Sequence, residues 1–330
     1  MKIKYSDIIK NQPTTNIGVI GHVASGKSTL TYQITGTKTQ KFASELERNI
    51  TIQIGYANAK IFQDTKGVLH TASSDTESLQ DEYGIDMKLL KHISIVDCPG
   101  HESYMSNMIN GSAVMDACVL VIATNENIPQ PQTYEHLQAV ENIDIDDYIV
   151  IQNKMDLIKS NENLTKLTKI NSFLKNTKAE KSKIIPTSIQ KGINVKEVIK
   201  TIVKLPNFER KINEPARMII IRSFDINKQN QRYDRLQGGI VGGSLTNGLL
   251  KEDDIIEMRP GFYTKNKDEG FKYKPVYSTV RSLQSDTRKL KYAIPGGLIG
   301  VKLDIDPSLA KNNFLVGQML GHVNTLPEVY

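Results

Sequence analysis

Apolar and polar positions alternate in blocks along the first two-thirds of the chain, and the blocks predict alternating strands and helices. Runs of β-branched or continuously apolar residues predict buried strands at 15–21, 52–62, 93–96, 117–123, 148–152 and 184–186. Helical periodicity falls between them, at 28–34, 132–142, 161–176 and 194–204, and Gly36 can end the first helix. Strands that alternate with helices predict an α/β fold with a doubly wound, mostly parallel sheet.

The pattern changes after Leu205-Pro206. From Glu214 onward, short β-rich stretches alternate with glycines and no long helical period occurs: MIIIRSF, GGIVGGSL, DIIEMRP, STVRSL and GLIGVKL. This predicts a small antiparallel β-barrel, with the glycine pairs 238–239 and 242–243 as tight turns. We therefore expect an N-terminal extension over 1–13, an α/β domain over 14–208 and a β-barrel domain over 209–330.

A polar segment interrupts the α/β pattern at 64–91. It is rich in Ser, Thr and Asp and acidic around DTESLQDE. We expect an inserted loop or a poorly ordered excursion there.

Composition narrows the class of protein. A chain of 330 residues favours two or three domains, and no apolar run is long enough to span a membrane. The N-terminus lacks the apolar core of a secretory signal, and two cysteines, Cys98 and Cys118, are too few for a disulfide framework or a zinc site. These features predict a reduced, cytoplasmic protein. The net charge of +6 favours an anionic partner such as nucleic acid, although a bias towards Lys, Asn and Ile would also produce it.

Residues 21–28, GHVASGKS, fit the pattern G-x-x-x-x-G-K-[ST] between a predicted strand and a predicted helix. In such a phosphate-binding loop, backbone N–H groups surround phosphate oxygens. Lys27 would reach the β and γ phosphates and the Ser28 hydroxyl would bind Mg²⁺. The predicted nucleotide contacts here are Gly21, His22, Val23, Ala24, Ser25, Gly26, Lys27, Ser28 and Thr29.

A second group of candidates surrounds the γ-phosphate. Asp97 and Gly100 belong to DCPGH, directly after a predicted strand; the carboxylate can hold Mg²⁺ through water and the Gly100 N–H can bond the phosphate. His101 could position the attacking water, or it could be a solvated loop histidine. Thr51 could complete the Mg²⁺ shell when γ-phosphate is present, or it could be an ordinary strand residue.

The sequence NKMD at 153–156 follows another predicted strand and can select the base. Asn153 and Asp156 can read guanine, because a carboxylate accepts hydrogen bonds from the guanine ring N–H and amine, which adenine does not offer together. Lys154 would pack its stem on the base. The loop after the last strand would complete the pocket with Ser188, Ile189 and Gln190, the Ser188 backbone N–H bonding the guanine oxygen. Together the motifs predict a GTPase that uses GTP, GDP and Mg²⁺.

These segments resemble the translational GTPases of the elongation factor Tu class. Within that class the chain is similar, from Thr14 to its C-terminus, to the gamma subunit of archaeal and eukaryotic translation initiation factor 2. The stretches that carry this narrower resemblance include GHVASGKSTL, ELERNITIQIGYANAKI, PQPQTYEHLQAV, QNKMDL and GGIVGGSLTNGLL. IGYANAK and NMINGSAVMD are specific to that subunit.

The resemblance implies a G domain followed by β-barrels. It also implies GTP-dependent delivery of methionylated initiator tRNA to the small ribosomal subunit. The implied partners are the alpha and beta subunits of a heterotrimer, and no association with a membrane is implied. By position, the residues that match the family's phosphate, magnesium, guanine and water-positioning residues are Lys27, Ser28, Thr51, Asp97, Asn153, Lys154, Asp156, Ser188 and His101.

Several positions depart from the family pattern. Ser25 stands where the family usually has histidine, and we expect this to change loop contacts more than phosphate binding. Ala24 stands where elongation factors carry aspartate, as is usual in this subunit, so we expect slow hydrolysis without a stimulating factor. Ile189 replaces an alanine and could crowd the base pocket. The 64–91 insertion lies where the family has a zinc knuckle but contains no cysteine, so we predict no structural zinc there.

The family continues past LPEVY into a second barrel, whereas this sequence ends at Tyr330. On that basis the chain is expected to be a short form with weakened initiator tRNA binding. Two alternatives stay open: a scaffold or decoy for the other subunits, and a specialised elongation factor for another aminoacyl-tRNA. The IGYANAK segment argues against the second.

Overall fold

The computed structural model describes residues 5–40, 51, 53–143, 145–227, 231–232, 235–266 and 270–329. The chain forms two compact units. One consists of Pro13–Phe208, and the other combines Met1–Gln12 with Glu209–Tyr330. The first residues of the chain therefore belong with the β-barrel.

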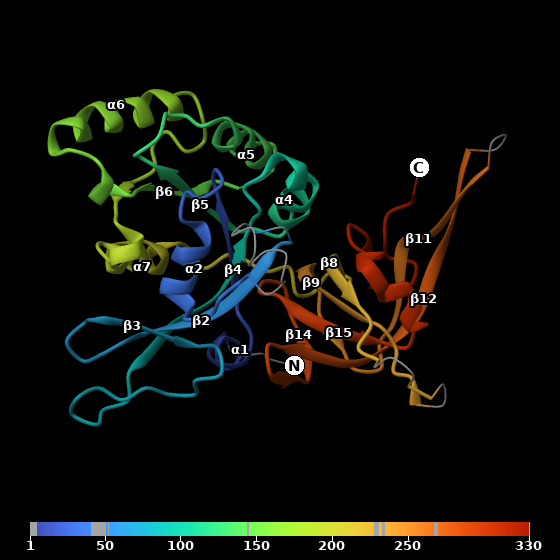
Figure 1. Ribbon diagram of the computed structural model, residues 1–330. Helices are drawn as coiled ribbons and strands as arrows, with labels where there is room; N and C mark the ends of the chain where they lie inside the picture. The colour runs from blue at the N-terminus through green and yellow to red at the C-terminus, as the bar shows by residue number, and fades with distance from the viewer. Residues whose placement is uncertain are drawn as a thin grey trace. The chain divides into compact units, whose positions relative to one another are not determined.

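A seven-stranded sheet forms the centre of the Pro13–Phe208 unit, in the order β3-β2-β4-β1-β5-β6-β7 (Figure 1). Its strands are β1 Thr15–Ile20, β2 Gly55–Gln63, β3 Leu69–Ser73, β4 Lys88–Asp97, β5 Ala117–Ala123, β6 Asp147–Asn153 and β7 Ile184–Pro186. Strands β4, β1, β5, β6 and β7 run parallel, while β2 and β3 are antiparallel to their neighbours. The predicted doubly wound, mostly parallel sheet is confirmed.

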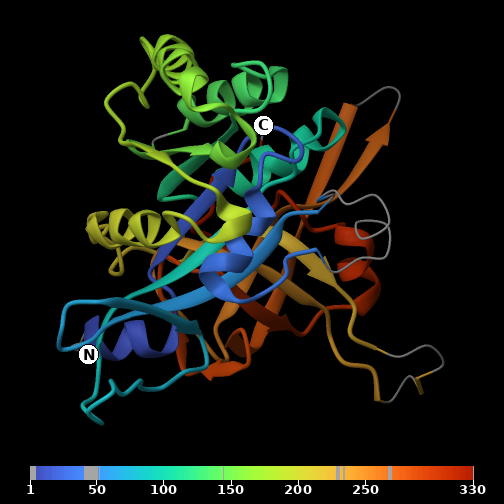
Figure 2. The same ribbon diagram turned by 60° about the vertical axis from the view of Figure 1, so that its left-hand side comes forward.

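Helices cover both faces of this sheet (Figure 2). They are α2 Lys27–Thr35, α4 Met105–Ser112, α5 Pro131–Glu141, α6 Asn163–Leu174 and α7 Val195–Lys204. Helices α2 and α7 bury Leu30 and Val198 in one apolar cluster against the sheet, and the buried residues of α4, α5 and α6 lie outside that cluster. Gly36 ends α2 in a left-handed conformation, as predicted, whereas α4 was not predicted. Among the described residues, no helix combines the length and apolarity needed to cross a membrane.

The insertion at 64–91 is more regular than its composition predicts. It contains β3, which pairs with β2, and the beginning of β4. Asp64 accepts hydrogen bonds from two backbone N–H groups and contacts His70, while Asp81 accepts from the N–H groups of Tyr83 and Ile85. The expectation of a poorly ordered excursion is wrong, because its acidic side chains close the turns. The absence of structural zinc remains a prediction.

The second unit is a closed antiparallel barrel. The strands of the barrel sheet are β8 Arg217–Phe224, β9 Ile240–Asn247, β11 Ile255–Asn266, β12 Gly270–Ser285, β13 Arg288–Leu290, β15 Ile299–Leu303 and β16 Met319–His322. Two short strands of this unit, β10 Leu250–Lys251 and β14 Tyr292–Ala293, form a separate pair. The order is β11-β16-β8-β9-β15-β12-β13, and pairing of β11 with β12 closes the ring around an apolar core. The predicted barrel is confirmed. Gly242 and Gly243 lie inside β9 rather than in turns: a Cβ at Gly243 would be 1.9 Å from the carbonyl oxygen of Ile219.

Helix α1, Tyr5–Asn11, was not predicted and belongs to the barrel unit. The residue after it, Gln12, is buried. Its Nε2 donates to the carbonyl oxygens of Ile294 (2.7 Å) and Gly296 (3.0 Å), and its Oε1 accepts from the N–H of Ile294. This side chain and Arg288, which donates to the Lys10 carbonyl oxygen and to the Asn11 side chain, hold the N-terminal segment on the barrel.

Candidate nucleotide-binding site

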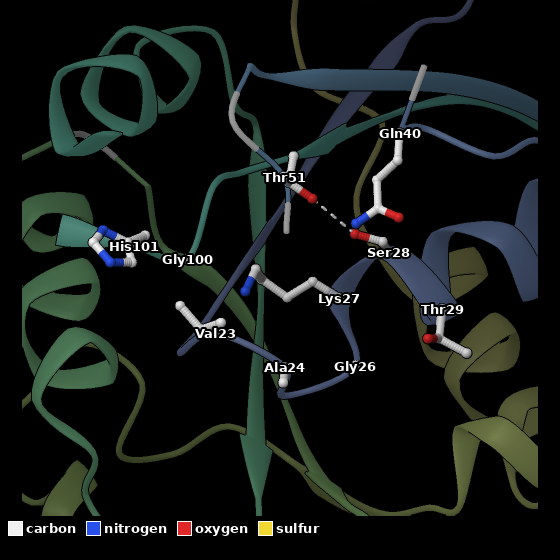
Figure 3. Close-up of a pocket in the computed structure, with 10 residues that line it drawn as sticks. All are labelled: Val23, Ala24, Gly26, Lys27, Ser28, Thr29, Gln40, Thr51, Gly100 and His101. Carbon is white, nitrogen blue, oxygen red and sulfur yellow. Dashed lines mark hydrogen bonds between the residues drawn. The ribbon is translucent and has the colours of Figure 1, made fainter. Parts of the chain in front are cut away.

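The loop after β1 surrounds a pocket of about 200 Å³ (Figure 3). The residues that line it are Val23, Ala24, Gly26, Lys27, Ser28, Thr29, Gln40, Thr51, Gly100 and His101. Gly21 and Gly26 have φ of 139° and 110°, and a Cβ on Gly21 would be 2.3 Å from the carbonyl oxygen of Val121. Glycine is required at these positions because the loop turns sharply against β5.

Lys27 supplies a buried cation at the base of this pocket. Its Nζ donates to the carbonyl oxygens of Gly21 (2.9 Å) and His22 (2.6 Å). Burial lowers the pKa of Lys27 to about 8, with the nearby Asp97 acting in the opposite direction. A buried ammonium group at the floor of a pocket is suited to an anion.

Gly100 lets that ammonium group and the phosphate loop lie close against its backbone. A Cβ there would lie 2.6 Å from the Nζ of Lys27 and 2.9 Å from the backbone nitrogen of Val23. Lys27 and Val23 both line the pocket, and these two nitrogen atoms form a cradle with the chemistry of a phosphate site. The residues present therefore fit a nucleoside triphosphate.

Hydroxyl and carboxylate oxygens gather on the other side of Lys27. The Oγ of Ser28 is 3.1 Å from the Oγ1 of Thr51, as the dashed line in Figure 3 marks. Asp97 is fully buried, and its Oδ2 accepts a 2.6 Å hydrogen bond from the Oγ1 of Thr39. Oxygen ligands of this kind, with few carboxylates, suit Mg²⁺, which retains several waters. Neither Thr39 nor Gln40 was among the predicted residues.

His101 lies across the pocket from Ser28 (Figure 3). Its ring is exposed, and its Nδ1 accepts a 3.2 Å hydrogen bond from the N–H of Ser103, which caps the short 3₁₀ helix Glu102–Tyr104. The ring therefore has a local structural contact as well as a place at the pocket wall. Its catalytic role stays a prediction.

Asn153 connects the phosphate loop to the loop after β7. Its Nδ2 donates to the carbonyl oxygen of Ser25 at 2.8 Å, and its Oδ1 accepts from the Oγ1 of Thr187 (3.2 Å) and the N–H of Ile189 (3.1 Å). A Cβ on Gly26 would be 2.3 Å from that Nδ2. The buried amide thus braces three segments, a role beyond the base reading predicted for it.

Asp156 presents an ionised carboxylate near the same loop. Its Oδ1 accepts from the Oγ of Ser188 at 2.7 Å, and its Oδ2 is 3.2 Å from the Nζ of Lys191. The Ser188 hydroxyl, and then Lys191, lower the pKa of this carboxyl group. Lys154 adopts a left-handed conformation (φ 63°) just before Asp156. The carboxylate is therefore a fixed acceptor, as guanine recognition requires.

The remaining predicted base contacts behave differently. Gln190 is exposed. Ile189 is 1% exposed and belongs to the apolar cluster under α2 and α7. The expectation that Ile189 crowds the base pocket is wrong, because its side chain packs into the core.

His136 is a residue near the site that the sequence did not reveal. It lies on α5, fully buried, and its Nδ1 accepts from the N–H of Gly21 at 3.3 Å. Burial, reinforced by the charge of Lys27, lowers the pKa of His136 to about 4, so the ring is neutral at pH 7. The backbone of Gly21 is therefore bonded at both polar groups: its N–H donates to His136, and its carbonyl oxygen accepts from Lys27.

Comparison with known proteins agrees with this geometry. The sequence profile of the elongation factor Tu GTP-binding domain matches residues 12–207. Over 98% of its length the chain is 46% identical to eukaryotic translation initiation factor 2 subunit 3 of Drosophila melanogaster, spanning 70% of that protein. It is also 46% identical to eukaryotic translation initiation factor 2 subunit gamma of Schizosaccharomyces pombe, spanning 74% of it. The chain belongs to the gamma-subunit family of translation initiation factor 2.

Solved structures with the same fold are translational GTPases. A bacterial selenocysteine-specific elongation factor superposes with a TM-score of 0.69 at 23% identity, over 94% of this chain and 45% of that one. Elongation factor SelB of Methanococcus maripaludis, in complex with the GTP analogue GPPNHP, superposes with a TM-score of 0.68 at 22% identity, over 96% of this chain and 56% of that one. The chain spans about half the length of these two structures. Family membership makes it a guanine-nucleotide-binding GTPase of translation initiation, and the elongation-factor alternative is not favoured.

Proposed function

We propose that the chain is the subunit that carries GTP and Mg²⁺ in an initiation factor, and that it helps to deliver methionylated initiator tRNA to the small ribosomal subunit. In this proposal it acts in the cytoplasm with alpha and beta subunits and retains the tRNA in the GTP state. The family relationship and the phosphate cradle support it.

Each candidate residue receives one task. Lys27, the loop amides of 21–29 and the Gly100 N–H bind the β and γ phosphates. Ser28, Thr51 and Asp97 would hold Mg²⁺, which supplies positive charge to the phosphate oxygens. Asp156 accepts hydrogen bonds from guanine, and the stem of Lys154 stacks on the base. Ser188 and Gln190 lie beside the base, and Asn153 braces the surrounding loops. His101 orients the attacking water.

One observation carries the proposal: Asn153 ties the phosphate loop, through Ser25, to the loop of Ser188, whose hydroxyl fixes Asp156. The groups for the phosphates and for the base thus belong to one hydrogen-bonded framework. A protein that bound only a phosphate would not need the base-reading carboxylate to be fixed in this way.

Filter binding of radiolabelled methionylated initiator tRNA, with the non-hydrolysable analogue GPPNHP and with GDP, tests the delivery function. We expect at least about tenfold tighter retention with GPPNHP, and retention that weakens steeply between 50 and 200 mM salt, because phosphate contacts dominate RNA affinity. Methionylated elongator tRNA is the matched control and should be retained more weakly. Equal retention in both nucleotide states would contradict the proposal.

His101→Ala is expected to reduce GTP turnover about 100-fold, because a group that positions the attacking water contributes on this scale. GTP affinity should change less than twofold, since no phosphate contact is assigned to the ring. Single-turnover hydrolysis of γ-labelled GTP, with and without small ribosomal subunits, measures the effect.

His101→Asn separates catalysis from capping. Asparagine is a good helix N-cap, so it preserves the contact to the Ser103 N–H but lacks the imidazole. If both variants lose turnover equally, the imidazole is required. If His101→Asn turns over normally, the cap accounts for the effect and His101 has no place in the chemistry.

A further inference from the structure

Thr39 contacts the candidate magnesium site but belongs to none of the nucleotide-binding motifs and has no part in the proposed function. The residue lies after α2, is 6% exposed, and donates from its Oγ1 to the Oδ2 of Asp97 at 2.6 Å. Hydrogen bonds to buried carboxylates are short and strong. This bond fixes the orientation of the Asp97 carboxylate from one side.

Gly55 makes room for that contact. It is the register partner of Asp97 in the antiparallel pair β2–β4. A Cβ on Gly55 would be 2.6 Å from the Cβ of Thr39 and 3.3 Å from its Oγ1. Only glycine at this point of β2 lets Thr39 lie over the strand and reach the carboxylate. This gives the IGYANAK segment, which begins at Ile54, a physical reason for its glycine.

Thr39 and Thr51 thus both contact the candidate magnesium site. Thr39 bonds Asp97, and Thr51 contacts Ser28. The two attachments differ in kind, because Ser28 and Thr51 are both candidate metal ligands whereas Thr39 acts through Asp97.

We propose that Thr39 is a positioning residue for Mg²⁺: its hydroxyl holds the Asp97 carboxylate in the orientation that the metal and its waters require, and Gly55 exists to admit it. The inference rests on the proposed function, which assigns Asp97 to magnesium. It adds Thr39 and Gly55 to the residues that determine metal affinity. It predicts that substituting them weakens nucleotide retention only when Mg²⁺ is present.

Thr39→Val removes the hydroxyl and keeps the branched shape that packs over Gly55. We expect the Mg²⁺ concentration for half-maximal retention of mant-GDP to rise roughly tenfold, because the carboxylate loses a charge-assisted donor. In excess EDTA, mant-GDP dissociation should stay within about twofold of the unsubstituted chain. Thr39→Ser, which keeps the hydroxyl, should restore most of the Mg²⁺ response.

Gly55 is tested by a double-mutant cycle. Gly55→Ala should raise the Mg²⁺ requirement like Thr39→Val, and the double variant should be little worse than either single one, because both changes break the same bond. Additive effects would show that Gly55 does not act through Thr39. Thermal unfolding of the nucleotide-free variants checks that they are folded.

The outcomes separate two failures. If Mg²⁺ does not slow mant-GDP release from the unsubstituted chain, the proposed magnesium site itself is wrong. If Mg²⁺ slows release equally in the unsubstituted chain and in Thr39→Val, only the role of Thr39 is wrong. A Thr39→Val variant that loses mant-GDP faster in EDTA as well would assign Thr39 to packing and overturn the inference.

Discussion

Lys27→Met is expected to weaken GTP binding at least about 100-fold, because charge-assisted hydrogen bonds to two phosphates contribute roughly 1.5–3 kcal/mol each. The same change should leave the nucleotide-free protein folded. Burial without an anion lowers the pKa of Lys27 from 10.5 to about 8, so keeping the charge at pH 7 opposes folding by roughly 3 kcal/mol. Methionine removes that penalty but leaves the carbonyl oxygens of Gly21 and His22 without their donor, and the two effects oppose each other.

The pH dependence provides a second signature of Lys27. Because its pKa in the nucleotide-free protein lies near 8, the ammonium group loses its proton as the pH rises through 8, and GTP affinity should fall by up to tenfold per pH unit above that value. The destabilisation of the nucleotide-free fold is complete below pH 8 and fades between 8 and 10.5. Fluorescence titration with mant-GTP from pH 7 to 9.5 measures the first effect and thermal unfolding the second.

Lys60→Met is the matched control. Lys60 is also fully buried, on β2, but its Nζ donates to the carbonyl oxygen of Thr76 rather than to the phosphate loop. This variant should keep GTP affinity within about threefold and retain the pH dependence. If Lys27→Met binds GTP normally, or if its affinity still falls above pH 8, Lys27 is not the phosphate ligand.

Local order along the chain explains why much of this site could be predicted from the sequence. The phosphate loop is contiguous and lies between a strand and a helix, so GHVASGKS alone contains half of the residues that line the pocket. Asp97 and Asn153 end β4 and β6, and parallel strands of one sheet bring their carboxyl ends to the same edge. The folds of both units could be predicted for the same reason. The hydrophobic pattern of each helix or strand is local, so it can be recognised within the segment itself.

The residues that were missed act through contacts between distant segments. Thr39 and Asp97 are 58 positions apart, and Gly21 and His136 are 115 apart. Thr39 follows a helix and His136 lies within one, and the sequence around each of them does not indicate which distant residue it contacts. A poorly ordered excursion was one of two expectations for the insertion, on the basis of its polar, acidic composition, but Asp64 and Asp81 accept hydrogen bonds from backbone N–H groups and close turns. The expectation that Ile189 crowds the base pocket was wrong because a sequence gives the size of a side chain but not the direction in which it packs.

Asp156→Asn is expected to change base selection from guanine to xanthine. The Oγ of Ser188 donates to Oδ1 of the carboxylate, so an asparagine keeps its oxygen at that position and places its amide nitrogen where Oδ2 now lies. Guanine offers a donor there and would be repelled by the amide, while xanthine offers a carbonyl oxygen and would accept from it. In that orientation the amide nitrogen would face Lys191, whose Nζ lies 3.2 Å from Oδ2. Because both groups are donors, the exposed lysine side chain would have to turn away.

We expect GTP affinity to fall at least about 100-fold and XTP affinity to rise by a similar factor, because a site built around a polar partner rejects an analogue that leaves that partner unpaired. Competition of GTP, XTP and ATP against mant-GDP and mant-XDP measures both changes. Asp304→Asn is the matched control: this aspartate pairs with Arg281 in the barrel unit and should leave base preference unchanged. Ser188→Ala combined with Asp156→Asn should blunt the switch, because the hydroxyl that orients the amide is gone. An Asp156→Asn protein that still prefers GTP to XTP would mean that this carboxylate does not read the base, and the framework joined by Asn153 would then hold a phosphate without selecting guanine.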